Sequence, residues 1–232
     1  MQIGGLEKNS LIDFPGKLSS VLFFSGCNFN CPYCHNPELA LGCPSRPAAV
    51  NFEEICRFLE SRRGFLDGVV ISGGEPTLQS DLIEVCSRIK QLGYAVKLDT
   101  NGSRPKVLKR LIDQCLVDYI AMDLKTDPLL YTAYIQRNCD PAPIFSSIQI
   151  IMQSGVDYEF RTTCVKPIVT RLTIENISQK IQNAQLYVLQ HFRNHDVLHP
   201  EFFRDCDYEY SNDKLVQLKA IADQWVQKCI IR

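Results

Sequence analysis

The sequence lacks any hydrophobic run long enough to cross a membrane. Its apolar stretches, such as 21–24 and 68–72, are short, whereas a spanning helix needs about 20 residues. The chain also lacks a basic and apolar signal segment, because it opens with Met1-Gln2-Ile3-Gly4-Gly5. We therefore expect no membrane partner and a cytoplasmic location.

An excess of one charge sign is also missing. The 25 Lys and Arg residues nearly balance the 26 Asp and Glu residues, which gives a formal net charge of −1 and a pI near 6.4. A nucleic-acid backbone is bound mainly by a broad basic field. The composition therefore argues against a nucleic-acid partner, and any partner has to be inferred from the site residues.

The cysteines do not form the pattern of a disulfide framework. There are 11 of them, an odd number in a chain without a secretory signal, which is typical of a thiol-reduced compartment. Outside the segment 27–34 no C-x2-C pair occurs, and most of the other cysteines fall on apolar helix stripes, where a free cysteine acts as a small hydrophobe. A second metal cluster is therefore not expected. No internal repeat, low-complexity stretch or linker is present, so a single domain over 1–232 is expected.

One stretch combines three cysteines within eight residues. Cys27, Cys31 and Cys34 have the spacing C-x3-C-x2-C, and no fourth cysteine follows at ferredoxin spacing. A [4Fe-4S] cluster normally takes four thiolates, so three protein ligands leave one iron open for another molecule. The alternatives are a zinc knuckle or ordinary buried thiols. Zinc would need a fourth ligand, and His35 adjoins Cys34, so its side chain would point away from a shared tetrahedral site. The spacing predicts a cluster loop over 25–36.

Apolar runs alternate with amphipathic stretches along most of the chain. After a leading segment or short hairpin over 3–16, the pattern predicts six strands: 18–25, 68–72, 95–99, 117–122, 158–164 and 186–189. Apolar stripes between and after them predict helices, around Ile55 to Leu59, Leu82 to Leu92, Val107 to Cys115, Pro143 to Ser154, Ile174 to Ile181, and Leu215 to Cys229. Alternating strands and helices imply a parallel sheet with right-handed crossovers. Six units are too few for an eight-stranded barrel, so we predict an α/β fold, a partial (β/α)6 barrel that is open on one side.

Polar groups follow the predicted strands, where ligands gather in parallel sheets. Gly73 and Gly74 allow a close backbone approach to a ligand because they lack a Cβ, and Glu75 is a candidate acceptor for an ammonium group. The alternative is a plain strand-to-helix turn that Pro76 begins. Asp99 is a candidate acceptor for a ribose or amino group, or a helper in holding a cation; its alternative is a self-satisfied turn with Asn101.

The next two strands carry charges. Asp123 and Lys125 flank Leu124 and should point to the same face of an extended strand; the alternative is a rim ion pair of little energetic value. Arg161 lies midway along an apolar strand, where burial requires an anion. Its expected partner is a cofactor carboxylate or, alternatively, a structural salt bridge.

Three histidines recur at spacings of four, at His191, His195 and His199. In a helix this spacing would give a ligand face. Asn194, Asp196 and Pro200 favour a loop instead, so no metal role is assigned. Gln190 and His191 directly follow the last predicted strand and are weak candidates for an adenosine contact.

Together these features resemble the radical S-adenosylmethionine family, and within it the anaerobic ribonucleoside-triphosphate reductase activating proteins. The resemblance rests on the following stretches: Gly4-Gly5-Leu6, Ser10 to Gly16 (SLIDFPG), Gly26 to Leu39 (GCNFNCPYCHNPEL), Gly73 to Thr77 (GGEPT), Met122 to Lys125 (MDLK) and Tyr187 to Gln190 (YVLQ). Beyond His191 the resemblance is loose. It implies the same partial barrel as the periodicity, in the form of a (β/α)6 fold.

The resemblance also implies cofactors and roles. A [4Fe-4S] cluster held by Cys27, Cys31 and Cys34 would bind S-adenosylmethionine at its open iron and cleave it reductively, and the resulting 5′-deoxyadenosyl radical would take hydrogen from a glycine of the partner reductase. The implied cofactor-binding residues are Tyr33, Cys34, His35, Gly73, Gly74, Glu75, Asp99, Asp123, Leu124, Lys125 and Arg161. The implied partners are anaerobic ribonucleoside-triphosphate reductase and a flavodoxin- or ferredoxin-type electron donor. Three alternatives remain open: an activase of another glycyl-radical enzyme, a radical enzyme acting on a small molecule, and a non-enzymatic iron-sulfur electron carrier.

Overall fold

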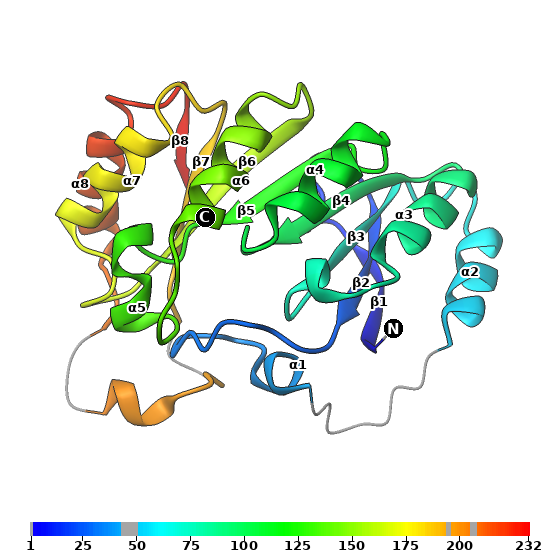
Figure 1. Ribbon diagram of the computed structural model, residues 1–232, viewed down its shortest axis with the longest axis horizontal. Helices are drawn as coiled ribbons and strands as arrows, with labels where there is room; N and C mark the ends of the chain where they lie inside the picture. Colours follow the sequence, from blue (N-terminus) through cyan, green and yellow to red (C-terminus); the bar gives the residue numbers. More distant parts are fainter. Residues whose placement is uncertain (1, 43–50, 194–195, 205–207) are drawn as a thin grey trace. The chain divides into compact units, whose positions relative to one another are not determined.

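The fold is α/β with a mostly parallel, open sheet. A computed structural model describes residues 2–42, 51–193, 196–204 and 208–232, and its elements are shown in Figure 1. The strands are β1 (Ile3–Ser10), β2 (Ser19–Phe24), β3 (Gly68–Gly73), β4 (Ala95–Thr100), β5 (Tyr119–Asp123), β6 (Asp157–Cys164), β7 (Tyr187–His191) and β8 (Cys229–Ile231). They follow one another in the sheet in chain order. The predicted α/β class and open parallel sheet are therefore confirmed.

Helices connect most of these strands. The α-helices are α1 (Pro37–Leu41), α2 (Phe52–Ser61), α3 (Leu82–Gln91), α4 (Pro105–Asp113), α5 (Tyr131–Tyr134), α6 (Ala142–Met152), α7 (Arg171–Lys180) and α8 (Asn212–Ala222). Short 3-10 turns are η1 (Pro76–Leu78), η2 (Pro128–Leu130) and η3 (Pro200–Phe203). Within the described residues, no helix is both long and apolar enough to cross a membrane.

The chain divides into two compact units, so the expected single domain stays a prediction. Unit 1 comprises Met1–Asn28, Glu38–Thr100 and Lys106–Ile120, and unit 2 comprises Phe29–Pro37, Asn101–Pro105 and Ala121–Arg232. Unit 1 therefore contains Cys27, whereas unit 2 contains Cys31 and Cys34.

Unit 1 is built on parallel pairing of β2, β3 and β4. β2 pairs with β3 from Ser19 to Phe24, and β3 pairs with β4. The residues that line this sheet, including Val21 and Val70, are fully buried with Phe14. α2 begins where the Asn51 side chain accepts a hydrogen bond from the Glu53 N–H, as expected for an Asn N-cap.

Unit 2 contains the parallel pairs of β6 with β7 and of β7 with β8. α7 and α8 pack against each other and bury apolar stripes that include Ile174, Ile177 and Leu215. α6 buries Ile144, Ile148 and Ile151, one face of a helix as the spacing of three and four requires.

Two strands were not predicted as such. β1 pairs antiparallel with β2, in line with the short hairpin considered for 3–16. The sequence did not predict it as a strand, because it contains two glycines and its apolar and polar residues do not alternate. β8 falls where we predicted the last turns of a closing helix. That prediction is wrong from Asp223 onward, because α8 ends at Ala222 and the Gln227 N–H donates to the Ala184 carbonyl at 2.9 Å. The six predicted strands correspond to β2 to β7, and β1 and β8 extend the open sheet to eight strands among the described residues.

The cysteines outside the motif mostly follow the prediction. Cys56, Cys86, Cys164 and Cys229 are buried, and burial raises the pKa of the Cys86 thiol to about 12. Cys115 is an exception, because it follows α4 with a φ of 51° and is exposed. Cys43 and Cys206 lie outside the described residues. The buried thiols are packing residues, as their raised pKa keeps them protonated and unreactive.

Candidate active site

In unit 1, the start of the cysteine motif is joined to the turn after β3. The Gly74 N–H donates to the Phe24 carbonyl and the Glu75 N–H to the Gly26 carbonyl, both at 2.8 Å. The Cys27 N–H donates to the Ala40 carbonyl at 3.0 Å. The backbone on both sides of Gly26 is therefore fixed, and Cys27 leaves β2 from a defined position.

The two glycines of this turn serve a close approach between backbones. Gly73 has a φ of +116°, and a Cβ on it would overlap the backbone of Phe24. A Cβ on Gly74 would overlap the Gly26 carbonyl. The sequence predicted that these glycines let a ligand approach the backbone closely, and that stays a prediction. Within unit 1 the structure shows that they allow the close approach of the end of β2.

Gly74→Ala is expected to lower the free energy of unfolding by about 1–3 kcal/mol, because an added methyl group must displace backbone rather than a flexible side chain. Gly5→Ala is the matched control, since its Cβ would meet only a Phe23 ring carbon at 3.9 Å. Urea unfolding of both variants measures the effect. Equal stabilities would show that the turn tolerates the methyl group and that the close approach is unimportant.

Glu75 caps the turn that follows β3. Its Oε1 accepts hydrogen bonds from the Thr77 N–H at 3.0 Å, from the Thr77 hydroxyl, and from the Thr100 hydroxyl at 2.8 Å. The side chain is 1% exposed. Pro76 begins η1, as in the strand-to-helix turn considered as the alternative, and the hydrogen bonds orient the Glu75 carboxylate. Its role as an acceptor for a ligand stays a prediction.

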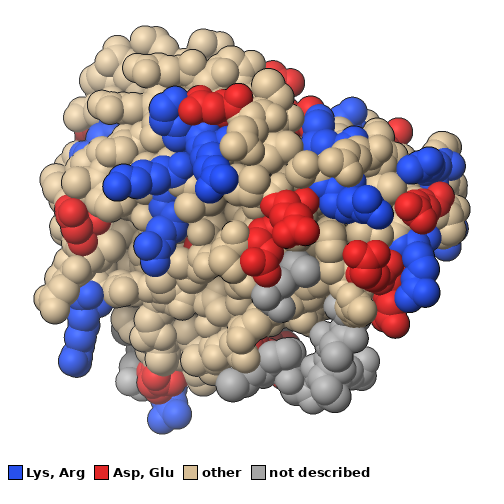
Figure 2. Space-filling model, turned by 45° about the vertical axis from the view of Figure 1, so that its right-hand side comes forward, with Lys and Arg blue, Asp and Glu red and all other residues tan. Residues whose placement is uncertain are grey.

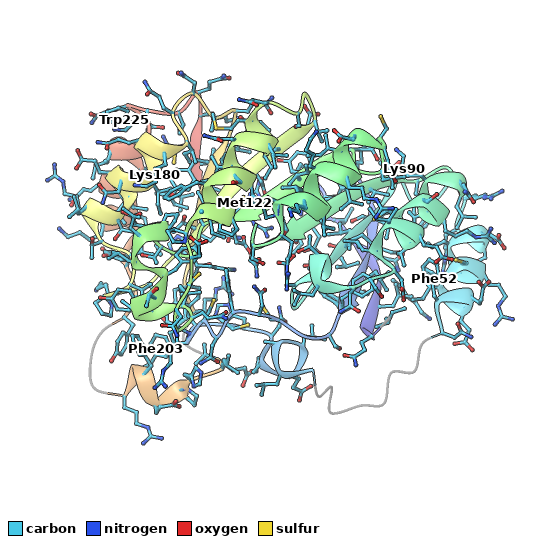
Figure 3. All side chains as sticks on the ribbon, in the orientation of Figure 1. Phe52, Lys90, Met122, Lys180, Phe203 and Trp225 are labelled. Atoms are coloured by element: carbon cyan, nitrogen blue, oxygen red, sulfur yellow. The ribbon has the colours of Figure 1, made fainter. Side chains whose placement is uncertain are left out.

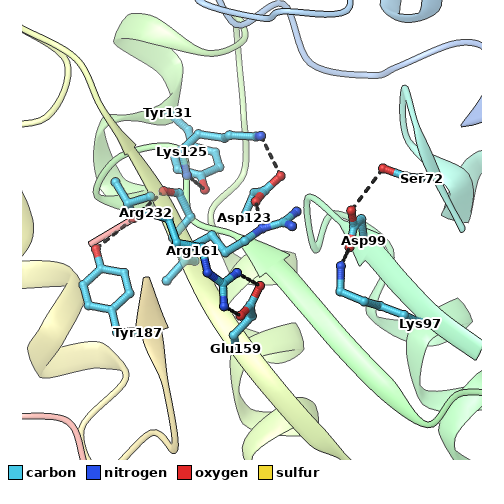
Figure 4. Close-up of polar contacts among 12 residues, drawn as sticks. Ser72, Lys97, Asp99, Asp123, Lys125, Tyr131, Glu159, Arg161, Tyr187 and Arg232 are labelled. Atoms are coloured by element: carbon cyan, nitrogen blue, oxygen red, sulfur yellow. Dashed lines mark hydrogen bonds and ion pairs between the residues drawn. The ribbon is translucent and has the colours of Figure 1, made fainter. Parts of the chain in front are cut away.

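Asp99 is held by two groups of unit 1 (Figure 4). Its Oδ1 forms an ion pair with Lys97, and its Oδ2 accepts from the Ser72 hydroxyl at 3.1 Å. Lys97 is 1% exposed, and this carboxylate offsets the cost of burying its ammonium group. Sequence reasoning missed Lys97, although the spacing of two along a strand is the signal that it used for Asp123 and Lys125.

In unit 2, the segment Phe29–Pro37, here called the cysteine loop, contains the other two motif cysteines. Cys31 is 6% exposed and Cys34 is half-buried. The Asn30 N–H donates to the Ile135 carbonyl at 3.0 Å, and the Cys34 N–H donates to the Cys31 carbonyl at 3.1 Å. This tight turn keeps the two cysteines close together along the backbone.

Asp123, Lys125 and Arg161 form a charged trio in unit 2, shown in Figure 4. Asp123 Oδ1 is 2.7 Å from Arg161 Nε, and Asp123 Oδ2 is 2.9 Å from Lys125 Nζ. Burial would raise the pKa of Asp123, but the two cations lower it well below its usual range. The predicted common face of Asp123 and Lys125 is confirmed, and Arg161 forms a salt bridge with Asp123, while its contact with a cofactor carboxylate stays a prediction. One carboxylate facing two cations leaves the trio with a net positive charge, which suits an anionic ligand.

Two tyrosines and two of the motif cysteines, Cys31 and Cys34, lie near Lys125 within unit 2. The Tyr33 hydroxyl donates to the Lys125 carbonyl at 2.8 Å, and the Lys125 N–H donates to the Tyr131 hydroxyl at 2.9 Å. Burial alone lowers the pKa of the Lys125 ammonium, but the negative charges of Asp123 and of the Cys31 and Cys34 thiolates outweigh burial and raise that pKa. Tyr33 lies between Cys31 and Cys34 in the chain, so its hydrogen bond to the Lys125 carbonyl places the segment with these two cysteines beside the trio. Leu124 is 1% exposed, and its N–H donates to the Arg161 carbonyl.

This arrangement fits the cofactors that the motif implies. Thiolates are the usual ligands of iron-sulfur clusters, and a cationic group beside them matches a carboxylate. Among the described residues, no three His, Cys, Asp or Glu side chains form a site for a single metal ion. Each thiolate of a [4Fe-4S] cluster can bind a different iron, so the three thiols need not converge on one ion.

The histidines of the tail do not form a helical face. His191 ends β7 and His199 precedes η3, while His195 lies outside the described residues. His35 is exposed, stacks on Phe192 with ring centroids 5.7 Å apart, and contacts the Arg193 carbonyl through Nε2 at 2.8 Å. The loop interpretation of this region is confirmed for the described residues.

The family profile described as the radical SAM superfamily matches residues 21–181. A protein of Methanocaldococcus jannaschii, provisionally named a glycyl-radical enzyme activating enzyme, is 35% identical over 99% of this chain and 95% of its own length. The pyruvate formate-lyase-activating enzyme of Streptococcus mutans is 33% identical over 53% of this chain and 50% of its own length.

Solved structures share the fold at low sequence identity. SuiB of Streptococcus suis, bound to S-adenosylmethionine, has a TM-score of 0.67 at 14% identity and covers 91% of this chain and 51% of its own. Methylornithine synthase has a TM-score of 0.62 at 16% identity, with coverages of 92% and 63%. These likenesses extend across most of the described sheet and helices.

Proposed function

Because this chain belongs to the radical S-adenosylmethionine superfamily, whose members use a [4Fe-4S] cluster and S-adenosylmethionine, we propose that it activates a glycyl-radical enzyme. The observation that carries the proposal is the gathering in unit 2 of Cys31 and Cys34 with the net cationic trio of Asp123, Lys125 and Arg161. The relative that is 35% identical over nearly all of both chains supports the class of partner.

The three motif cysteines are the proposed ligands of the cluster. With thiolates of Cys27, Cys31 and Cys34 as its ligands, the bound cluster supplies the electron that cleaves the sulfonium of S-adenosylmethionine when one iron is left open. The turn that joins Cys31 and Cys34 and the backbone bonds at Gly26 and Cys27 hold the ligand-bearing backbone in place.

Charged and polar groups are proposed to orient the amino-acid end of S-adenosylmethionine. Lys125 and Arg161 would attract its carboxylate, because their trio carries one more positive than negative charge. Backbone groups of Gly73 and Gly74, Glu75 and Asp99 would accept hydrogen bonds from its ammonium or ribose. Tyr33, Leu124 and His35 are further proposed contacts, since they lie within the cysteine loop or adjoin Lys125.

The proposed protein substrate is anaerobic ribonucleoside-triphosphate reductase, with a flavodoxin- or ferredoxin-type protein as electron donor. The second candidate substrate is another glycyl-radical enzyme, for which pyruvate formate-lyase is the natural test, because several relatives are named as its activating enzymes. The surface that Figure 2 shows places basic beside acidic side chains on a mostly uncharged background, which suits a protein partner better than a nucleic acid.

Anaerobic electron paramagnetic resonance tests the proposal. The reconstituted, reduced protein is incubated with S-adenosylmethionine and either the reductase or pyruvate formate-lyase, and samples without S-adenosylmethionine serve as controls. A stable glycyl-radical signal on the reductase supports the first candidate, and a signal on pyruvate formate-lyase alone supports the second. If S-adenosylmethionine is not cleaved and does not change the cluster spectrum, the proposal is wrong, and this result is the one that the electron-carrier alternative predicts.

A further inference from the structure

A segment after β7 lies along the cysteine loop within unit 2. The Leu198 N–H donates to the Cys34 carbonyl at 3.0 Å, and the His199 N–H donates to the Pro32 carbonyl at 3.1 Å. Pro32 lies between Cys31 and Cys34 in the chain, and the other carbonyl belongs to Cys34 itself. We call Val197–Phe203 the clamp segment.

The His199 ring adds a contact to the same loop. Its Nε2 is 2.9 Å from Asn30 Oδ1, and its Nδ1 is 2.9 Å from Glu201 Oε1. Asn30 directly precedes Cys31. The clamp segment thus contacts the cysteine loop before Cys31, between the two cysteines, and at Cys34.

Aromatic packing fixes the clamp segment itself. Phe203, labelled in Figure 3, stacks on Phe192 with ring centroids 5.0 Å apart and meets Tyr208 edge-on at 4.8 Å. Phe192 and Phe203 are 3% and 6% exposed. Phe192 also stacks on His35, which lies just beyond Cys34. Burial of these rings orders the clamp segment, so its hydrogen bonds to the cysteine loop form with little further loss of conformational entropy.

We propose that the clamp segment, through Leu198 and His199, is the positioning element that holds Cys31 and Cys34 in their ligand geometry. Without it, two carbonyls and one side chain of the loop lose protein partners, and the loop opens more often. Leu198 and His199 contact the backbone of the cysteine loop and Asn30, so any effect on the cluster would be indirect, through the positions of Cys31 and Cys34. The relevance to catalysis rests on the proposed function, whereas the restraint on the two thiols does not.

Thiol alkylation of the metal-free protein tests the restraint directly. His199→Ala removes the ring contact, and Leu198→Pro removes the N–H that bonds to Cys34. Each should raise the alkylation rates of Cys31 and Cys34 by iodoacetamide about fivefold, since loss of one such hydrogen bond shifts a local opening equilibrium by about that factor. Peptide mass spectrometry reads each cysteine separately. Exposed Cys115 should react at the wild-type rate and buried Cys86 should stay slow in every variant.

Two further variants separate positioning from general loosening. His199→Gln keeps an amide that can reach Asn30 and should restore most of the wild-type protection. Glu201→Ala removes only the exposed outer partner of His199 and should leave the rates unchanged. Unchanged rates at Cys31 and Cys34 in folded His199→Ala would overturn the proposal, as would equal acceleration at Cys86, which indicates global unfolding. If Leu198→Pro does not fold, the comparison of His199→Ala with His199→Gln decides.

The reconstituted protein gives the catalytic readout. His199→Ala should shift the cluster's reduction potential and its electron paramagnetic resonance spectrum, and His199→Gln should return both toward wild type. An unchanged reduction potential and spectrum in His199→Ala would overturn the proposal that the clamp segment positions the cluster ligands. If wild type binds no cluster, the proposed function fails, but the alkylation rates still decide whether the clamp restrains the loop.

Discussion

Cys31→Ala is expected to abolish cleavage of S-adenosylmethionine, with 5′-deoxyadenosine below detection. Cys27→Ala and Cys34→Ala should do the same, because a [4Fe-4S] cluster with three protein ligands has no spare thiolate to replace a lost one. The loss should exceed about 100-fold, since second-shell changes alone typically cost 10–100-fold at metal sites. Iron and sulfide content, the cluster's absorption and anaerobic product analysis together measure the effect.

Cys86→Ala is the matched control for these three variants. Cys86 lies on α3, is fully buried and contributes a small apolar side chain. Its replacement should lower stability by about 1 kcal/mol through the small cavity that it leaves and should leave cleavage per folded molecule unchanged. Full activity in Cys31→Ala would contradict the cluster assignment, and inactivity in folded Cys86→Ala would mean that the assay reports packing.

Asp123→Asn is expected to lower the free energy of unfolding by about 2–3 kcal/mol at neutral pH. The reason is that the carboxylate is the shared partner of two cations, and its loss leaves Lys125 and Arg161 partly buried without their counter-charge. Asp113→Asn breaks an exposed pair with Lys109 and should change stability by less than about 0.5 kcal/mol. Urea unfolding at neutral pH compares the two variants with wild type.

The stability difference between wild type and Asp123→Asn should depend on pH in one direction. The trio lowers the folded-state pKa of Asp123, so its contribution is fully present above the unfolded-state pKa of about 4 and is lost as the pH falls below that value. The difference should therefore be constant between about pH 5 and 7 and shrink below pH 4. A difference that grows on acidification would contradict the lowered pKa.

Several features of the site followed from local sequence alone. The common face of Asp123 and Lys125 follows from the alternation of side chains along a strand, and the helix around Ile55 to Leu59 follows from its apolar stripe. Strand β3 was found because it is a short, continuous apolar run that is buried from Gly68 to Ile71, and helix α6 was found because it is buried on one face.

Other features depend on contacts that periodicity does not record. Glu75 Oε1 accepts a hydrogen bond from the Thr100 hydroxyl at 2.8 Å. This pairing is not evident until the turn after β3 lies beside the end of β4. The carbonyls of Pro32 and Cys34 are reached by backbone N–H groups of residues more than 160 positions away in the chain.

The sequence by itself determined the cysteine spacing, the alternation of strands and helices, and hence the superfamily chemistry, because these are properties of neighbouring residues. Only the tertiary structure decided that β8 replaces the last turns of α8, that Gly73 and Gly74 admit the end of β2, and that Leu198 and His199 hold the cysteine loop. The physical reason is that backbone hydrogen bonds and close approaches form between groups that every residue carries. Side-chain pattern therefore does not show which of them meet until the chain has folded.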